Sequence, residues 1–163
     1  MLKADQSTTG TDGATEAAIA PVIRRWHQQF RGELPGGLES LIAEDCVFYS
    51  PIVFTPQKGK ALVLMYLQAA GISFGLGSKD RTDGSANKDG SRSVFRYTRE
   101  VLDGYHAVLE FESEIDGKYI NGIDSITCND MGQITEFKVL IRPLQAINAV
   151  HAQMQQALQN GQT

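Results

Sequence analysis

The sequence has little of several features that mark particular protein classes. Cys46 and Cys128 are its two cysteines in 163 residues, too few for a disulfide framework or a cysteine-rich zinc site. No apolar run approaches the roughly 18 residues that a membrane-spanning helix needs. The amino terminus also lacks the apolar core of a signal peptide. We therefore expect a cytoplasmic protein without a membrane partner, in which both cysteines are buried free thiols.

Positive charge is sparse as well. The 15 Lys and Arg residues are scattered along the chain and are outnumbered by 19 Asp and Glu residues, for a net charge of −4. A nucleic-acid surface needs clustered positive charge, so we expect no nucleic-acid partner. No set of His, Asp and Glu has the spacing of metal ligands, and no glycine-rich loop joins a strand to a helix to hold phosphates. We expect neither a metal nor a cofactor.

What the sequence does have is a regular order of amphipathic segments. A flexible polar tail, residues 1–13, precedes a single domain over residues 14–160, and a long polar loop near residues 74–93 interrupts that domain as a flexible insertion. Apolar residues at helical spacing predict four helices. These helices are expected from about Ala20 to Arg31, at Leu38–Ala43, at Lys60–Ala70 and after Pro143.

Alternating apolar and polar residues predict five strands. They are expected at Asp45–Tyr49, Val94–Leu102, His106–Ile115, Tyr119–Cys128 and Ile134–Ile141. Short turns, two of them Asp-Gly, separate the last four, which is the pattern of an antiparallel meander. The predicted fold class is α+β. A strongly curved antiparallel sheet forms a cone, the N-terminal helices pack on it, and a helix ends the chain.

The strand expected over residues 119–128 carries the most informative residue. With a two-residue period, Ile120, Gly122, Ile126 and Cys128 form an apolar face, and Asp124 lies in its middle. An acid on a core-facing surface is costly to ionise, so its pKa should be raised. Acids of this kind transfer protons or bind ligands, and the sequence therefore predicts a pocket with Asp124 inside it.

Several of these segments together resemble a known superfamily. They are the stretch from Leu41 to Pro51, Gly122-Ile123-Asp124, the stretch from Gly132 to Phe137, and Arg142-Pro143. Their order resembles the nuclear-transport-factor-2-like superfamily over about residues 15–155, and most of all its uncharacterised SnoaL-like members. The superfamily includes steroid isomerases, polyketide cyclases, epoxide hydrolases, dehydratases and non-enzymatic adaptors, so the resemblance implies a fold without choosing a function.

Only some of the catalytic residues of the ketosteroid isomerases have a matching residue in this sequence. The tyrosine on their first helix corresponds to Trp26, the base before the proline corresponds to Ser50, and the protonated aspartate corresponds to Asp124. A serine hydroxyl cannot shuttle a proton as a carboxylate does, which disfavours that mechanism. The acid set of the epoxide hydrolases is also incomplete, because Val139 stands where an acid is needed. The polyketide cyclases use one pocket aspartate, a role that Asp124 can fill.

We therefore expect a pocket for a hydrophobic small molecule, with Asp124 as its acid. The residues expected to bind the molecule are Trp26, Phe48, Ser50, Leu109, Phe111, Ser113, Phe137 and Val139. The leading hypothesis is a cofactor-free acid–base isomerase, dehydratase or cyclase that acts on a cyclic or carbonyl compound. The alternative is a non-catalytic dimeric ligand-binding or protein-interaction domain. In that reading Asp124 is a structural carboxylate, satisfied by Arg142, Ser50 or a backbone N–H.

The resemblance also implies a homodimer through the outer face of the sheet. On that face the sequence puts a row of acids, Glu110, Glu112 and Glu114, which Lys138 and Arg142 would neutralise.

Overall fold

The computed structural model describes residues 16–74 and 95–160. Its elements run in the order α1 (Ala20–Phe30), a 3-10 helix η1 (Leu38–Leu41), β1 (Ile42–Tyr49), β2 (Gln57–Lys58), α2 (Lys60–Ser73), β3 (Arg96–Asp103), β4 (His106–Ile115), β5 (Lys118–Cys128), β6 (Ile134–Arg142) and α3 (Leu144–Asn160). The tail predicted at residues 1–13 and, apart from Phe74, the loop predicted near residues 74–93 lie outside the described residues. No helix within the described ranges is long and apolar enough to cross a bilayer.

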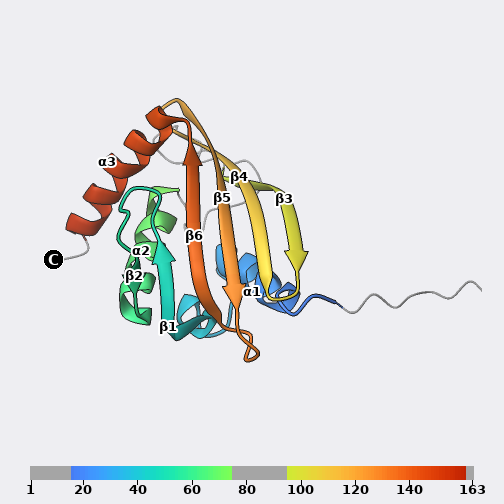
Figure 1. The fold of residues 1–163 in the computed structure, drawn as a ribbon. Coiled ribbons are helices and arrows are strands. Elements are labelled where there is room, and N and C mark those ends of the chain that lie inside the picture. Colours follow the sequence, from blue (N-terminus) through green and yellow to red (C-terminus); the bar gives the residue numbers. More distant parts are fainter. Residues whose placement is uncertain (1–15, 75–94, 161–163) are drawn as a thin grey trace, which may run out of the picture.

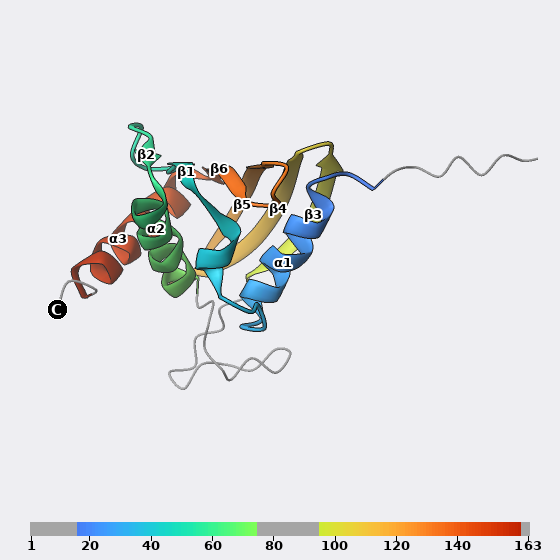
Figure 2. The same ribbon diagram turned by 90° about the horizontal axis from the view of Figure 1, so that it is seen from below.

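The six strands form one strongly curved sheet in the order β2-β1-β6-β5-β4-β3. Neighbouring strands are antiparallel except for β1 and β6, which are parallel. Helices α1 and α2 lie on the concave side of the sheet, and α3 packs beside α2 (Figures 1 and 2). The predicted α+β class and the curved sheet packed by helices are confirmed.

Turn chemistry explains how the meander forms. Between β4 and β5, Asp116 and Gly117 have φ angles of 51° and 70°, the two positive values that a tight two-residue hairpin requires. The resulting register pairs Leu109 with Asp124, and the β5–β6 register pairs Asp124 with Val139. Residues that face each other across strands project to the same side of the sheet, so all three side chains point toward the helices.

Some predicted boundaries were wrong. Strand β1 begins at Ile42, three residues before the predicted Asp45, because Ile42 pairs with Ile134 of β6 and is fully buried. The segment between β1 and α2 contains the short strand β2, which was not predicted. Helix α2 extends to Ser73, beyond the predicted end at Ala70, and the Ser73 hydroxyl donates to the carbonyl oxygen of Ala69 in its last turn.

The core lies between the helices and the concave side of the sheet. Ile19, Val22, Ile23 and Trp26 form the buried face of α1, as the helical spacing predicted. Arg25, on the same helix, donates hydrogen bonds to the carbonyl oxygens of Ser40 and Gly132. It thereby fixes α1 against η1 and the β5–β6 turn. Both cysteines are buried and free, as expected.

Candidate functional site

A cavity of about 410 Å³ lies between the concave side of the sheet and the three helices. Ligand sites of small-molecule proteins have volumes of roughly 300 to 1,000 Å³, so the cavity is large enough for a ligand. Its wall is dominated by aromatic side chains. The aromatic residues that line it are Trp26, Phe30, Phe48, Phe74, Phe95, Phe111 and Phe137.

The structure brings together six of the nine residues predicted for the site. They line this cavity: Trp26, Phe48, Phe111, Asp124, Phe137 and Val139. The other three, Ser50, Leu109 and Ser113, do not contribute to its wall. Leu109 is fully buried, and Ser113 is buried on β4 with no hydrogen-bond partner for its hydroxyl among the described residues.

Ser50 has a local role that the sequence reading missed. Its hydroxyl oxygen accepts hydrogen bonds from the backbone N–H groups of Ile52 at 3.1 Å and Val53 at 3.2 Å. The side chain therefore caps the turn after β1, and Pro51 is the residue of this turn that lines the cavity. Serines commonly form such turns, because their short side chain reaches backbone groups two and three residues ahead.

Asp124 is the one ionisable side chain among the described residues that line the cavity. It lies on the concave side of β5, as predicted, and only 6% of its surface is exposed. Burial raises its pKa to about 7, and a hydrogen bond from Tyr97 acts in the opposite direction. The carboxyl group therefore changes charge near neutral pH, whereas an exposed aspartate is ionised throughout that range.

A chain of two hydrogen bonds holds this carboxyl group. The indole N–H of Trp26 donates to the Tyr97 hydroxyl over 2.9 Å, and that hydroxyl donates to Asp124 Oδ2 over 2.7 Å. An indole nitrogen can only donate, so the tyrosine oxygen accepts from Trp26 and directs its own proton to Asp124. The proton of neutral Asp124 is then best carried by the other oxygen, Oδ1.

Oδ1 of Asp124 has no hydrogen-bond partner among the described residues, while Asp124 itself lines the cavity. Neutral Asp124 can therefore present an O–H donor to a bound molecule. The partners suggested from sequence were wrong: Arg142 donates to Asn121 Oδ1 at 2.7 Å, and Ser50 caps a turn. The partner is Tyr97.

Tyr97 is the functional residue that sequence reasoning missed. It lies on β3, where a bulge between Tyr97 and Arg99 interrupts the alternation that would have assigned its face. The signal available was the pair Phe95 and Tyr97, two aromatic residues at the two-residue spacing of one strand face. Burial and the nearby carboxyl group raise the pKa of Tyr97 well above its usual value, so its hydroxyl stays protonated as a donor.

A contact between a histidine and a glutamate lies beside this hydrogen-bond chain. His27 Nε2 is 2.6 Å from Glu100 Oε1, and the imidazole packs edge-on against the Tyr97 ring, with 5.5 Å between ring centroids. Glu100 and Tyr97 thus partly cover His27.

The mouth of the cavity is polar but carries no charge among the described residues. Gln29 on α1 is half-buried and Gln68 on α2 is exposed, and both line the cavity. Neither side-chain amide makes a hydrogen bond to a described residue. Ile72, also in the wall, is 68% exposed, whereas Asp124 is 6% exposed. Asp124 is therefore in the buried part of the cavity, and the exposed Gln68 and Ile72 mark its opening, toward which the half-buried Gln29 also lies.

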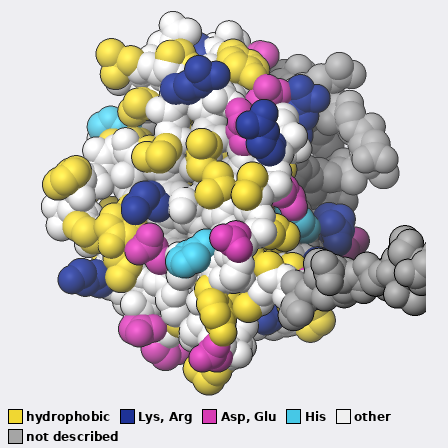
Figure 3. Space-filling model, turned by 45° about the vertical axis from the view of Figure 1, so that its right-hand side comes forward, with side chains coloured by type: hydrophobic (Ala, Val, Ile, Leu, Met, Phe, Trp, Pro, Cys, Tyr) yellow, Lys and Arg dark blue, Asp and Glu magenta, His cyan; other side chains and the backbone are white. Residues whose placement is uncertain are grey.

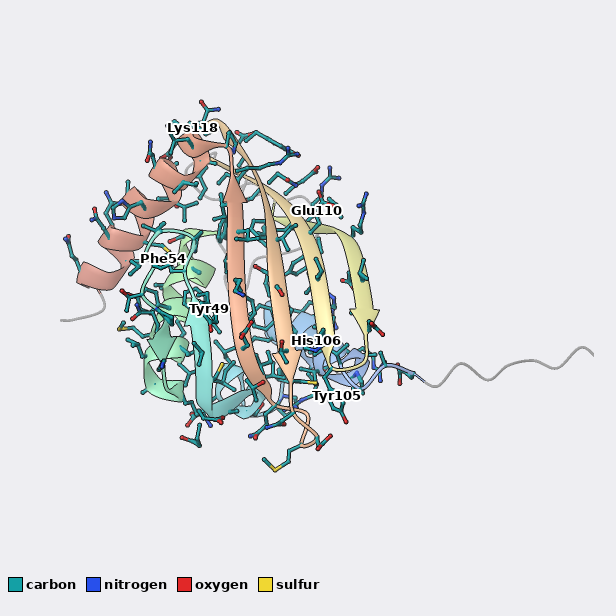
Figure 4. All side chains as sticks on the ribbon, viewed as in Figure 1. Tyr49, Phe54, Tyr105, His106, Glu110 and Lys118 are labelled. Carbon is teal, nitrogen blue, oxygen red and sulfur yellow. The ribbon has the colours of Figure 1, made fainter. Side chains whose placement is uncertain are left out.

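The outer face of the sheet differs in detail from its prediction. Glu112 pairs with Arg96 and Glu110 with Arg99, both arginines coming from the neighbouring strand β3 rather than from β6. Exposed hydrophobic side chains lie among these charges (Figure 3); those on the strands include Val101, Val108, Tyr119 and Leu140. Figure 4 labels Tyr49 and Glu110 on this face; Lys138 Nζ lies 4.6 Å from the ring centre of Tyr49.

No protein family model and no curated protein matches the chain by sequence. Its structure is similar to several solved ones. A steroid delta-isomerase from Pseudomonas aeruginosa is 28% identical, with 89% of this chain and 94% of that chain covered and a TM-score of 0.71. An uncharacterised bacterial protein with a cystatin-like fold, from Silicibacter pomeroyi, is 26% identical, with 85% of each chain covered and a TM-score of 0.66.

A third similar structure is a nuclear-transport-factor-2-like protein of unknown function from Mesorhizobium loti. It is 19% identical, with 77% of this chain and 92% of that chain covered and a TM-score of 0.56. The described part of this chain has three α-helices packed on a six-stranded, mostly antiparallel, curved sheet. This chain has the nuclear-transport-factor-2-like, or cystatin-like, fold.

Proposed function

We propose that the chain binds an apolar cyclic ketone in the cavity and that neutral Asp124 acts as an acid on the carbonyl oxygen. The observation that carries this proposal is the hydrogen-bond chain from Trp26 through Tyr97 to Asp124 Oδ2. It leaves Oδ1 as the carboxyl oxygen that donates into an otherwise apolar cavity. A carboxylic acid kept neutral by burial is suited to donating to an oxygen that gains negative charge in a reaction.

The chemistry that follows is activation of the ketone. Donation to the carbonyl oxygen polarises the ketone and acidifies the neighbouring C–H. The proton from that carbon passes to water, because no second ionisable side chain is among the described residues that line the cavity. The resulting enol begins isomerisation, dehydration and aldol cyclisation alike. The similarity to a steroid delta-isomerase supports isomerisation of an unsaturated cyclic ketone as the first of these to test.

A second candidate function is ligand binding without catalysis. The resemblance puts a proton-accepting base at the position of Ser50, where the hydroxyl is already bound to the backbone N–H groups of Ile52 and Val53. A protein that has the acid without this base binds a ketone through the same contact and does not convert it.

The test uses Trp26, the one tryptophan of the chain, which lines the cavity and reports its occupancy by fluorescence. Androst-5-ene-3,17-dione is the probe, since its isomerisation produces a conjugated ketone that absorbs in the ultraviolet. Asp124→Asn keeps an N–H donor but removes the acidic proton, and Asp124→Leu removes both. Ser125→Ala, on the outer side of the same strand, is the matched control.

Turnover by the wild type that is lost in Asp124→Asn, with binding retained, supports the enzyme. Binding without turnover, weakened in Asp124→Leu but not in Ser125→Ala, supports the non-catalytic candidate. If no cyclic ketone changes the Trp26 fluorescence of a protein that circular dichroism shows to be folded, both the enzymatic and the non-catalytic candidate functions are contradicted.

A further inference from the structure

The two ends of the cavity differ in chemistry, and this difference limits the molecule that fits. At the inner end, Asp124 presents one donor in a position that is almost fully buried. At the opening, Gln29 and Gln68 present side-chain amides without hydrogen bonds to described residues. Aromatic and aliphatic side chains line the space between them.

Charge is the second constraint. None of the described residues that line the cavity is a lysine, arginine or histidine. A carboxylate or phosphate enclosed in the cavity would lose its hydration without gaining a positive partner, and one at the inner end would lie beside the carboxyl group of Asp124. At the opening, no positive side chain among the described lining residues would attract it. The two amides can instead donate to and accept from a neutral hydroxyl or carbonyl, since each carries both kinds of group.

We infer that the ligand is an elongated, uncharged molecule with a second polar group at the end opposite its ketone, and that Gln29 and Gln68 form the subsite for that group. The inference rests on the proposed function, because Asp124 must hold the ketone end for the far end to reach the amides. The amides are then specificity-determining residues that choose among apolar ketones.

The experiment compares ligands that differ only at the far end. Androstan-3-one has the ketone as its single oxygen, dihydrotestosterone adds a hydroxyl at the opposite end, and the corresponding 3-oxo acid carries a carboxylate there. Each is titrated at pH 6 with Trp26 fluorescence as the readout, in the wild type and in Gln29→Leu and Gln68→Leu. Gln28→Leu, next to Gln29 but outside the cavity wall, is the control.

In the wild type, the hydroxyl compound should bind roughly three- to tenfold more tightly than androstan-3-one, the range that one or two neutral hydrogen bonds give. The acid should bind at least about tenfold more weakly than the hydroxyl compound. Gln29→Leu or Gln68→Leu should abolish the preference for the hydroxyl compound over androstan-3-one. Gln28→Leu should preserve the preference.

Equal affinities for the two neutral ketones in the wild type, or a preference that survives in both glutamine variants, overturn the subsite. Either result leaves the proposed function intact, since the ketones still bind. If none of the three compounds changes the Trp26 fluorescence, the subsite and the proposed function are both overturned.

Discussion

The hydroxyl of Tyr97 on β3 donates to Asp124 Oδ2 on β5, a bond of 2.7 Å between residues 27 positions apart in the sequence. Strand β4 separates the two strands, so the bond crosses the concave side of the sheet. It opposes the effect of burial on the Asp124 carboxyl group, and the balance leaves a pKa of about 7. The hydroxyl that orients the acid therefore also tunes its charge state.

Removing this hydroxyl should raise the pKa of Asp124 further. Tyr97→Phe deletes a hydrogen bond that favours the ionised carboxylate, and such a bond to a charged group contributes roughly 1.5 to 3 kcal/mol, or about one to two pH units. Titration of the carboxyl carbon by NMR measures the shift. Tyr66→Phe, which removes a hydroxyl from the ring stacked on Phe48, is the control and should leave the titration unchanged. A midpoint that stays or falls in Tyr97→Phe would refute this account.

Stability should depend on pH through Asp124. Its pKa is about 7 in the folded chain and near the ordinary 3.9 in the unfolded chain, so the folded state holds a proton that the unfolded state releases. The free energy of unfolding therefore falls as pH rises through that window, by about 4 kcal/mol from this group in total. About 3 kcal/mol of this fall lies above pH 5. Asp124→Asn should lack it, and urea denaturation at pH 5 and pH 9 measures the difference.

Asp103→Asn, at an exposed position of β3, controls for the loss of one carboxyl group. If wild type and Asp124→Asn lose the same stability between the two pH values, Asp124 is not the group responsible.

Gly122 should tolerate no side chain. A Cβ atom at this position would collide with Cζ of Phe111 and lie 2.7 Å from the carbonyl oxygen of Leu140, which belongs to the backbone of β6. Gly122→Ala should destabilise the fold by about 1 to 3 kcal/mol or more, because the backbone must move. The urea midpoint, with an unchanged m-value, measures the loss, and Ser125→Ala on the same strand should differ from wild type by less than about 0.5 kcal/mol. A Gly122→Ala midpoint equal to that of the wild type would contradict the packing.

Replacing Ser113 with alanine should not destabilise the fold. Its hydroxyl oxygen is buried without a partner among the described residues, and a buried polar group left unpaired costs roughly 1 to 3 kcal/mol. Ser113→Ala should therefore leave the free energy of unfolding unchanged or raise it by up to about 1 kcal/mol. Chemical denaturation measures this, and a loss above about 1 kcal/mol would indicate that the hydroxyl is bound in solution.

The depth of Asp124 could be predicted from sequence because burial alternates along β5 from Gly122 to Cys128. Gly122, Ile126 and Cys128 are buried, and Asp124 lies on the same face between them. The same periodicity in β4 and β6 placed Phe111 and Phe137 on the face that lines the cavity. The fold class followed from the order of helices and strands and from the hairpin turns.

Contacts between distant side chains could not be predicted in this way. Periodicity predicts which face of a helix or strand a side chain lies on, but not which side chain it contacts. It therefore could not predict the hydrogen bond from the Trp26 indole to a hydroxyl on β3. The bulge in β3 hid Tyr97, because one extra residue reverses the faces on either side of it. Ser50 was misjudged because a serine after a strand either lines a pocket or binds the backbone of the next turn, and one sequence does not distinguish the two.

The parallel pairing of β1 with β6 has a consequence for how the chain folds. Strands β3 to β6 are adjacent both in the sequence and in the sheet, so the meander forms from contacts of short sequence separation. Joining β1 to β6 instead closes a loop that contains most of the domain, at a higher cost in chain entropy. We therefore expect the meander to assemble first, with its concave apolar side still open to solvent. The cavity is completed in the slow final stage, when Phe48 on β1 reaches Phe137 on β6.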